Sequence, residues 1–263
     1  MPSMHPIGRP ALATARTPDE RRGRTVTPVR GLCLGTCLGV VLITALLGAP
    51  GEAGAARPLT TDDAGVNEPG TCQVEAWRDQ DRGAHHHHVA PACGVVTGVE
   101  LGVEGVWSAP RDEQAQGRGL ALKWVPAWAR LDAIQFGLKL GVSSQKEPGA
   151  RQWGAGQSTA LVLASMPLHE HWDLHLNAGH LHRTDQQGVD TAYAAALVWR
   201  PHPRWQLGAE VLGNLQTSAQ KSLSLRHWLI PETLGLDLTA SRMGSRAETG
   251  SWGIGIGWYG IRF

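Results

Sequence analysis

Apolar residues alternate with polar or small residues in short segments that recur along the chain from about residue 70 to its end. In residues 134–142, large apolar side chains occupy every second position, and Gln, Gly and Lys fill the positions between them. Similar segments lie at 120–124, 172–177, 205–211 and 234–239. Because successive side chains of a β-strand point to opposite faces, this period of two predicts strands. About twelve such segments can be counted, which indicates an all-β chain.

The connections between these segments also alternate, between short turns such as RPHPR and PE and longer polar loops such as RDEQAQGR and SQKEPGARQWGAG. Transmembrane barrels of the bacterial outer membrane have short periplasmic turns and longer extracellular loops. We therefore predict a transmembrane antiparallel up-and-down β-barrel of about 12 strands in the bacterial cell outer membrane, in contact with its lipid.

A β-sandwich is the alternative fold, since it also contains many short strands. Tryptophan positions favour the barrel, because seven of the indoles lie near the short turns or the C-terminus, where an amphipathic ring suits a membrane interface. They are Trp124, Trp128, Trp172, Trp199, Trp205, Trp228 and Trp258.

The chain ends in SWGIGIGWYGIRF, where Ile254, Ile256 and Trp258 share one parity but Tyr259, Ile261 and Phe263 take the other. Ile254, Ile256 and Trp258 are expected to face lipid, and the glycines between them the lumen. Either a β-bulge lies near Gly257 or the last residues leave the barrel face.

Residues 1–56 have the features of a secretory signal peptide after a long N-terminal extension. Several arginines precede an uncharged apolar run, and Ala53 and Ala55 are spaced like a cleavage site. An uncleaved membrane anchor is the alternative. The predicted domains are therefore the extension with signal peptide (1–56) and the barrel (57–263).

Cys72 and Cys93 would be the two cysteines of the exported chain. Export favours a disulfide between them, and a hairpin centred near residue 82 or 83 would place them opposite each other. Free buried thiols are the alternative.

Charged and polar residues on the inward parity of the strands are predicted to line the lumen. We expect them either to neutralise one another in a filled lumen or to form a constriction that selects solutes, with Lys123 diagonally between Glu100 and Glu104. The predicted set is Glu100, Glu104, Lys123, Gln135, Lys139, Asp173, His175, Asn177, Glu210, Arg226 and Asp237.

Four consecutive histidines, His85, His86, His87 and His88, are assigned to a long loop. Adjacent imidazoles can bind a transition metal weakly, but neighbours on a strand point apart, so a solvated loop is the alternative and no firm metal site is predicted. No cofactor is expected, and a net charge of +1 gives no case for a nucleic-acid partner.

The stretch RPLTTDDAGVNEPGTCQVEAW, residues 57–77, resembles the start of a family of bacterial outer-membrane proteins named after the meta-cleavage pathway of phenol degradation. The segments ACGVVTGVELGVEG and LGLDLTASRMG add to this resemblance. It implies a monomeric, transporter- or porin-like barrel without catalytic residues. The wider resemblance to outer-membrane proteins implies that Phe263 is recognised by the barrel-assembly machinery.

The leading functional hypothesis is a channel, not an enzyme, for passive passage of a small solute, aromatic or hydrophobic if the resemblance is followed. A plugged structural or surface-binding barrel, with metal bound through the His85–His88 loop, is the second hypothesis. A lipid-modifying enzyme using His180, Ser144 and Asp185 is the third, although no local motif selects these residues.

Overall fold

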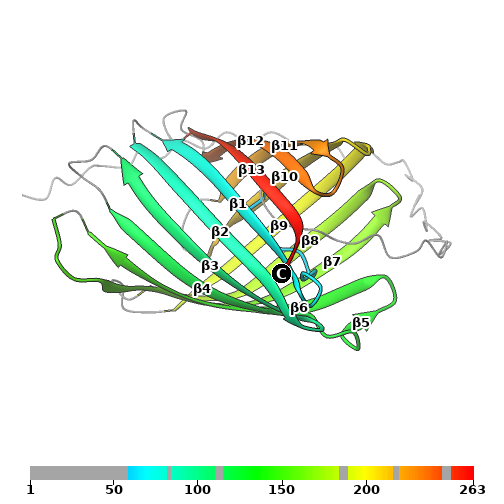
Figure 1. Ribbon diagram of the computed structural model, residues 1–263, viewed down its shortest axis with the longest axis horizontal. Helices are drawn as coiled ribbons and strands as arrows, with labels where there is room; N and C mark the ends of the chain where they lie inside the picture. Colours follow the sequence, from blue (N-terminus) through cyan, green and yellow to red (C-terminus); the bar gives the residue numbers. More distant parts are fainter. Residues whose placement is uncertain are drawn as a thin grey trace, which may run out of the picture. The chain divides into compact units, whose positions relative to one another are not determined.

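The computed structural model describes residues 59–81, 84–109, 115–147, 149–183, 189–215, 219–244 and 250–263, whose strands form one closed antiparallel β-sheet (Figure 1). The strands are β1 (Thr71–Asp81), β2 (Ala84–Val96), β3 (Val99–Ala109), β4 (Gln116–Trp124), β5 (Arg130–Leu131), β6 (Ile134–Lys146), β7 (Gly154–His169), β8 (Trp172–Arg183), β9 (Val189–His202), β10 (Trp205–Asn214), β11 (Gln220–Ile230), β12 (Leu234–Met243) and β13 (Gly250–Arg262). The predicted extension and signal peptide, residues 1–56, lie outside the described residues. None of the described segments is a helix long and apolar enough to cross a membrane.

The sheet closes because its first and last strands pair. β1 pairs with β13 from Thr71↔Arg262 to Asp81↔Ser251, and β4 pairs directly with β6. β5 is a two-residue strand within the β4–β6 connection and pairs only with the start of β6. The barrel wall therefore consists of twelve long strands, as predicted, and a closed wall excludes the sandwich.

The two parities of each strand have opposite environments. Outward residues such as Val103, Leu120 and Ile254 are about half exposed, whereas inward Lys123, Glu210 and Asp237 are buried. In hydrocarbon every backbone N–H and C=O must be paired within the protein, which a closed barrel with an apolar outer face achieves. The protein is thus built as an outer-membrane barrel.

The short and long connections sort to opposite ends, with two exceptions. Connections 97–98, 170–171, 203–204 and 231–233 lie at the end that we take as periplasmic. At the other end, 110–115, 147–153, 184–188, 215–219 and 244–249 join the strands. The exceptions are the 125–133 connection, which is long because it contains β5, and the 82–83 connection, where a long loop was predicted.

Six of the seven tryptophans near the short turns agree with an interfacial belt. Trp124, Trp199, Trp205 and Trp258 are 38–55% exposed on the outward face, and Trp172 stacks on Trp199 with ring centroids 5.5 Å apart. Trp128 lies in the β4–β6 connection and is 77% exposed. The prediction is wrong for Trp228, which faces the lumen because it pairs with Gly235 on the inward parity of β12.

The last strand contains the predicted bulge, two residues beyond the predicted position. Cys72 pairs with Ile261 and Val74 with Trp258, so β13 has one residue more than β1 in this interval. Gly260 has φ 69°, a left-handed conformation that glycine adopts without a Cβ clash. Tyr259 keeps the inward parity of Gly255 and Gly257, and the extra residue after it returns Ile261 to the outward parity.

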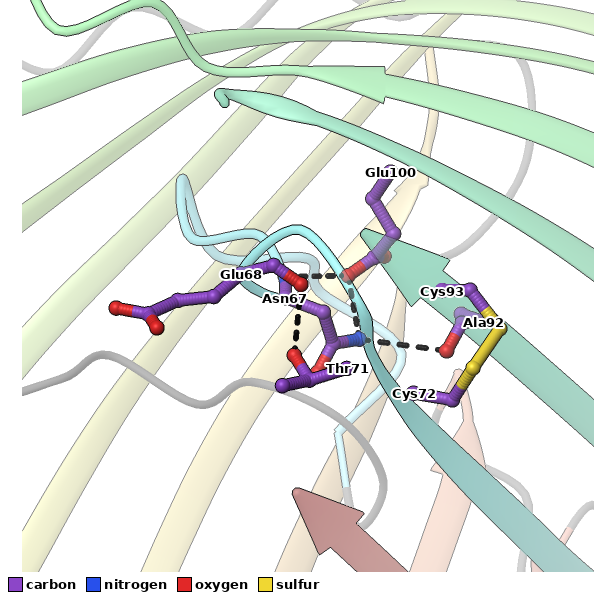
Figure 2. Close-up of a disulfide and its surroundings, with 7 residues drawn as sticks. All are labelled: Asn67, Glu68, Thr71, Cys72, Ala92, Cys93 and Glu100. Atoms are coloured by element: carbon purple, nitrogen blue, oxygen red, sulfur yellow. Dashed lines mark hydrogen bonds between the residues drawn. A yellow bond between two sulfur atoms is a disulfide. The ribbon is translucent and has the colours of Figure 1, made fainter. Parts of the chain in front are cut away.

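The predicted disulfide is confirmed. Cys72 and Cys93 are directly opposite in the β1–β2 register, with Cα atoms 4.0 Å apart, and their sulfurs are bonded. This bond joins the periplasmic ends of the two strands, beside the point where the chain enters β1 (Figure 2).

Candidate functional site in the barrel lumen

Residues 59–69, which precede β1, lie inside the barrel, and we call them the lumen segment. Leu59 packs in a buried cluster with Ala196 and Val198 of β9. Ala64 packs in a second buried cluster with Leu163 of β7 and with Val125. The segment therefore contacts the inner wall at two separated apolar positions.

Backbone groups of the lumen segment are hydrogen-bonded by inward side chains from different strands. The amides of Thr60 and Thr61 both donate to the carboxylate of Glu210. The hydrogen bond from the Thr60 amide is 2.8 Å long. Asn177 accepts from the amide of Asp62 and donates to its carbonyl, at 2.8 and 2.7 Å. Irregular backbone that is buried needs such partners, because an unpaired amide or carbonyl is costly away from water.

The second half of the segment is held in the same way. The amide of Ala64 donates to Ser165 Oγ at 2.7 Å. The amide and side-chain Nδ2 of Asn67 both donate to Glu100 Oε2, at 2.9 and 2.8 Å, and Nδ2 also reaches the Ala92 carbonyl at 3.5 Å (Figure 2). Glu100 thus anchors the segment close to the disulfide.

Two adjacent carboxylates of the segment meet the two inward lysines of β4 and β6. Lys139 Nζ lies 2.6 Å from Asp62 Oδ2, and Lys123 Nζ lies 3.5 Å from Asp62 Oδ1 and 3.4 Å from Asp63 Oδ1. Asp63 is only 1% exposed. Burial by itself would raise the pKa of Asp62, but the positive charges of Lys139 and Lys123 together outweigh it and hold this pKa below its ordinary value. Asp62 is therefore held as an anion between two cations, and Asp63 shares one of them, Lys123.

A second buried cluster lies where the barrel closes. Arg226 forms two 2.7 Å hydrogen bonds to the carboxylate of Asp237, and its Nη2 lies 3.9 Å from Glu75 Oε1. The Tyr259 hydroxyl donates to Glu75 over 2.6 Å, and the guanidinium also lies over the Trp228 ring. This cluster crosslinks β1, β11, β12 and β13 from the inside.

The histidine run belongs to β2 and not to a loop, so the loop assignment is wrong. Alternation along the strand sends His86 and His88 inward and His85 and His87 outward. His88 Nδ1 lies 3.0 Å from Glu104 Oε1, its Nε2 lies 3.6 Å from Asp79, and its ring stacks on Trp77. Within the described residues no group of three or more His, Cys, Asp or Glu side chains could hold a metal ion.

The remaining predicted lumen residues are distributed among local contacts. The predicted position of Lys123 between Glu100 and Glu104 is wrong, because the β3–β4 register pairs Glu100 with Lys123 and Glu104 with Gly119. Gln135 Nε2 donates to carbonyls of the β4–β6 connection, including that of Ala129 at 3.1 Å, so it supports a turn at the barrel end. Asp173 forms an ion pair with Arg200, and His175 Nδ1 lies 2.8 Å from Ser165 Oγ.

Sequence reasoning missed the lumen segment itself. Its residues Thr61, Asp62, Asp63 and Asn67 stand before the first predicted strand, where no periodicity marks them. One signal was present: the barrel has inward lysines, Lys123 and Lys139 among them, and the TTDDAGVNEPG stretch offers two consecutive carboxylates. Which carboxylates meet which lysines depends on the closed wall.

The proposed hydrolytic residues do not form a catalytic arrangement in the described part of the chain. His180 lies on the outward parity of β8 and Ser144 on β6, with β7 between these strands. Ser144 Oγ accepts a 3.0 Å hydrogen bond from Arg118 Nε. Asp185 lies outside the described residues.

A family model described as "Uncharacterised conserved protein UCP029691" matches residues 42–258. No curated protein matches. Among solved structures, a KdgM porin is similar over 71% of this chain and 98% of its own, with a TM-score of 0.55 and 8% identity. A NanC porin gives a TM-score of 0.50 over the same shares, also at 8% identity. Outer membrane phospholipase A from Escherichia coli gives 0.43 and 12% identity over 72% of this chain and 92% of its own. At these identities the likeness to the two porins extends to the fold, and the weaker match carries no argument.

Proposed function

The chain belongs to the family whose model covers residues 42–258, and we propose that it is an outer-membrane channel for a small polar solute in which the lumen segment constricts the path. The main observation behind this proposal is that charged and polar side chains on the inner wall are paired with the lumen segment. On the wall, Glu100, Lys123, Asn177 and Glu210 are each at most 8% exposed.

The buried cluster of Glu75, Arg226, Asp237 and Tyr259, which we call the seam cluster, supports the same proposal from the strands at which the barrel closes. Arg226 is 0% exposed and Asp237 3% exposed. The lumen segment contacts the inner faces of β3, β4, β6, β7, β8, β9 and β10, while the seam cluster occupies β1, β11, β12 and β13. Solute passage through the intact barrel therefore requires space beside the segment or movement of the segment.

A polar solute suits this lumen better than an aromatic or hydrophobic one. The resemblance to the phenol-pathway family suggested an aromatic or hydrophobic solute, and the family model that matches bears a different description. The inward parity carries carboxylates, lysines, histidines and an amide, and an apolar solute would have to displace their hydrogen bonds without replacing them. We infer no chemistry on the solute and hence no enzymatic activity.

The test is conductance in planar bilayers, comparing the full exported chain with a variant that lacks residues 59–67. We expect low or no conductance from the full chain and stable, larger steps from the deletion variant. Heat-modifiable mobility on a gel should first establish that both barrels are folded. A folded deletion variant that stays silent would overturn the channel proposal.

A plugged structural or surface-binding barrel is the second candidate, and the lumen segment favours it too. The conductance of the deletion variant distinguishes the two candidates. A channel should conduct once the segment is removed, whereas a structural barrel whose remaining lumen is filled by side chains should not. Loss of metal binding after replacing the four histidines would favour a surface-binding role, but their alternate orientation makes this the weaker form.

A further inference from the structure

The outward face of the barrel has charges of only one sign at the described positions. Each strand carboxylate whose side chain is described lies on the lumen parity: Glu75, Asp79, Glu100, Glu104, Asp173, Asp190, Glu210 and Asp237. The outward parity of the long strands nevertheless carries five Lys or Arg residues: Arg78, Arg118, Lys146, Lys221 and Arg242.

These five cations also share one end of the barrel. Each of them lies within the last four residues of its strand at the end of the barrel that carries the longer loops. Arg78 is directly opposite His87, and Lys221 is directly opposite Arg242. At the periplasmic end, by contrast, the described outward strand positions carry no Lys or Arg. Avoidance of the hydrocarbon centre would allow cations at both rims, so it does not account for this asymmetry.

A shallow groove of about 410 Å³ lies beneath the Arg78 position on the outward face. Its lining includes Ala76, Val89, Ile254 and Ile256 as an apolar floor, and Arg78 and His87 as its basic side. His87 stacks against Trp107, with ring centroids 6.0 Å apart. The groove therefore combines an apolar floor with the Arg78 guanidinium and the His87 imidazole at one end.

Two buried nitrogens at this place lack a hydrogen-bond partner in the part of the chain that is described. They are Arg78 Nε and His85 Nδ1. His85 is paired with Gln80, one outward position beyond the Arg78–His87 pair. An anionic oxygen acceptor at this position would satisfy the Arg78 Nε donor, and also His85 Nδ1 in the tautomer that carries its proton on this nitrogen.

We propose that this outward rim, centred on Arg78 and His87, binds a phosphorylated lipid of the outer leaflet. The lipid phosphate would lie against Arg78, and an acyl chain would occupy the groove over Ile254 and Ile256. Basic residues near a membrane surface strengthen binding of anionic lipids by about fivefold each. The inference is independent of whether the lumen conducts.

The test measures lipid binding to the detergent-solubilised barrel by native mass spectrometry. The probes are lipid A as a phosphorylated lipid, phosphatidylethanolamine as a zwitterionic one, and inorganic phosphate. Arg78→Gln should weaken lipid A binding about fivefold, and combining it with Lys221→Gln and Arg242→Gln should weaken it about a hundredfold. Arg204→Gln, in the periplasmic turn between β9 and β10, removes the same charge at the other rim and should leave binding unchanged.

Three results would overturn the proposal. One is equal lipid A affinity of the Arg78→Gln and Arg204→Gln barrels. Another is equal affinity for phosphatidylethanolamine and lipid A. The third is displacement of lipid A by inorganic phosphate at equal concentration, which would mean that the groove contributes nothing. Heat-modifiable mobility establishes that each variant is folded, and outward substitutions at this rim leave the lumen contacts intact.

Discussion

Replacing Lys123 by Met should release the lumen segment from the barrel wall. Lys123 is the cation that lies within 3.4 Å of the buried Asp63 carboxylate. Without it, Asp63 would keep a 3.0 Å hydrogen bond from the Gly65 amide. Asp62 would still be paired with Lys139 at 2.6 Å. The substitution therefore leaves one buried carboxylate without its counter-charge.

The size of the effect follows from the burial of this pair. Removing one partner of a buried ion pair costs roughly 3–5 kcal/mol, which corresponds to a change of about 10² to 10³·⁵ in the ratio of bound to released segment. Lys139→Met should have a smaller effect, about tenfold or less, because Lys139 is partly exposed and Asp62 keeps Lys123.

Hydrogen exchange read by mass spectrometry measures this ratio directly. The amides of Thr61, Ala64 and Asn67 donate to wall side chains, so the peptide that contains them is protected only while the segment is bound. We expect its exchange to speed up by the factors above while the strand peptides keep theirs. Adding Asp63→Asn to Lys123→Met should restore much of the protection, since both charges are then removed.

Unchanged protection of this peptide in a folded Lys123→Met barrel would refute the reasoning. It would mean that the carboxylate–lysine contacts do not hold the segment in place. Unchanged protection together with faster exchange of β4 would instead assign Lys123 to stability of the wall, which also contradicts a role in the segment.

Further consequences can be checked with the same peptide or with the barrel itself. Gly94→Ala should loosen the exit of the lumen segment, since a Cβ there would lie 2.2 Å from a segment carbonyl oxygen; normal exchange of the peptide in this variant would contradict that geometry. The Cys72→Ser and Cys93→Ser double variant should still form a barrel but lose about 3 kcal/mol of stability in urea titration, from a loop closed over 21 residues, and an unchanged midpoint would argue against it. Because the pKa of Asp62 is lowered in the folded protein, its contribution is complete above the unfolded pKa and is lost as pH falls through the lowered pKa. Segment protection, corrected for intrinsic exchange, should therefore stay constant from pH 8 to about 5 and decline below about 4, an acid step that Asp62→Asn removes; a decline between pH 7 and 5 would contradict this assignment.

Local periodicity was sufficient to predict the wall. The alternation in segments such as 134–142 depends only on the fixed side-chain period of a strand, and a chain with about twelve such segments can satisfy its backbone in lipid by closing. The same local information predicted the Cys72–Cys93 pair, because the two cysteines are symmetric about one hairpin. It also indicated the bulge, since a change of parity on one strand requires an extra residue.

The sequence predictions failed where they relied on nearness to a turn or on a run of identical residues and not on strand parity. Trp228 shares the position of the belt tryptophans in the sequence, yet it faces inward beside Arg226. Four identical polar residues show no alternation of apolar and polar side chains, so the sequence did not mark them as a strand. They lie in β2, where Trp77 and Glu104 of the neighbouring strands contact His88.

The sequence by itself determined the barrel, its inward polar set and its C-terminal strand, because each depends on neighbours along one or two strands. Only the tertiary structure decided what the inward set does. Glu210, Asn177, Lys123 and Glu100 lie on four different strands, and they converge on residues 59–69 because the wall is closed around that segment. Their partners in the segment are separated from them by up to 150 residues along the chain, so only closure of the sheet, and no local pattern, brings these wall side chains to the segment.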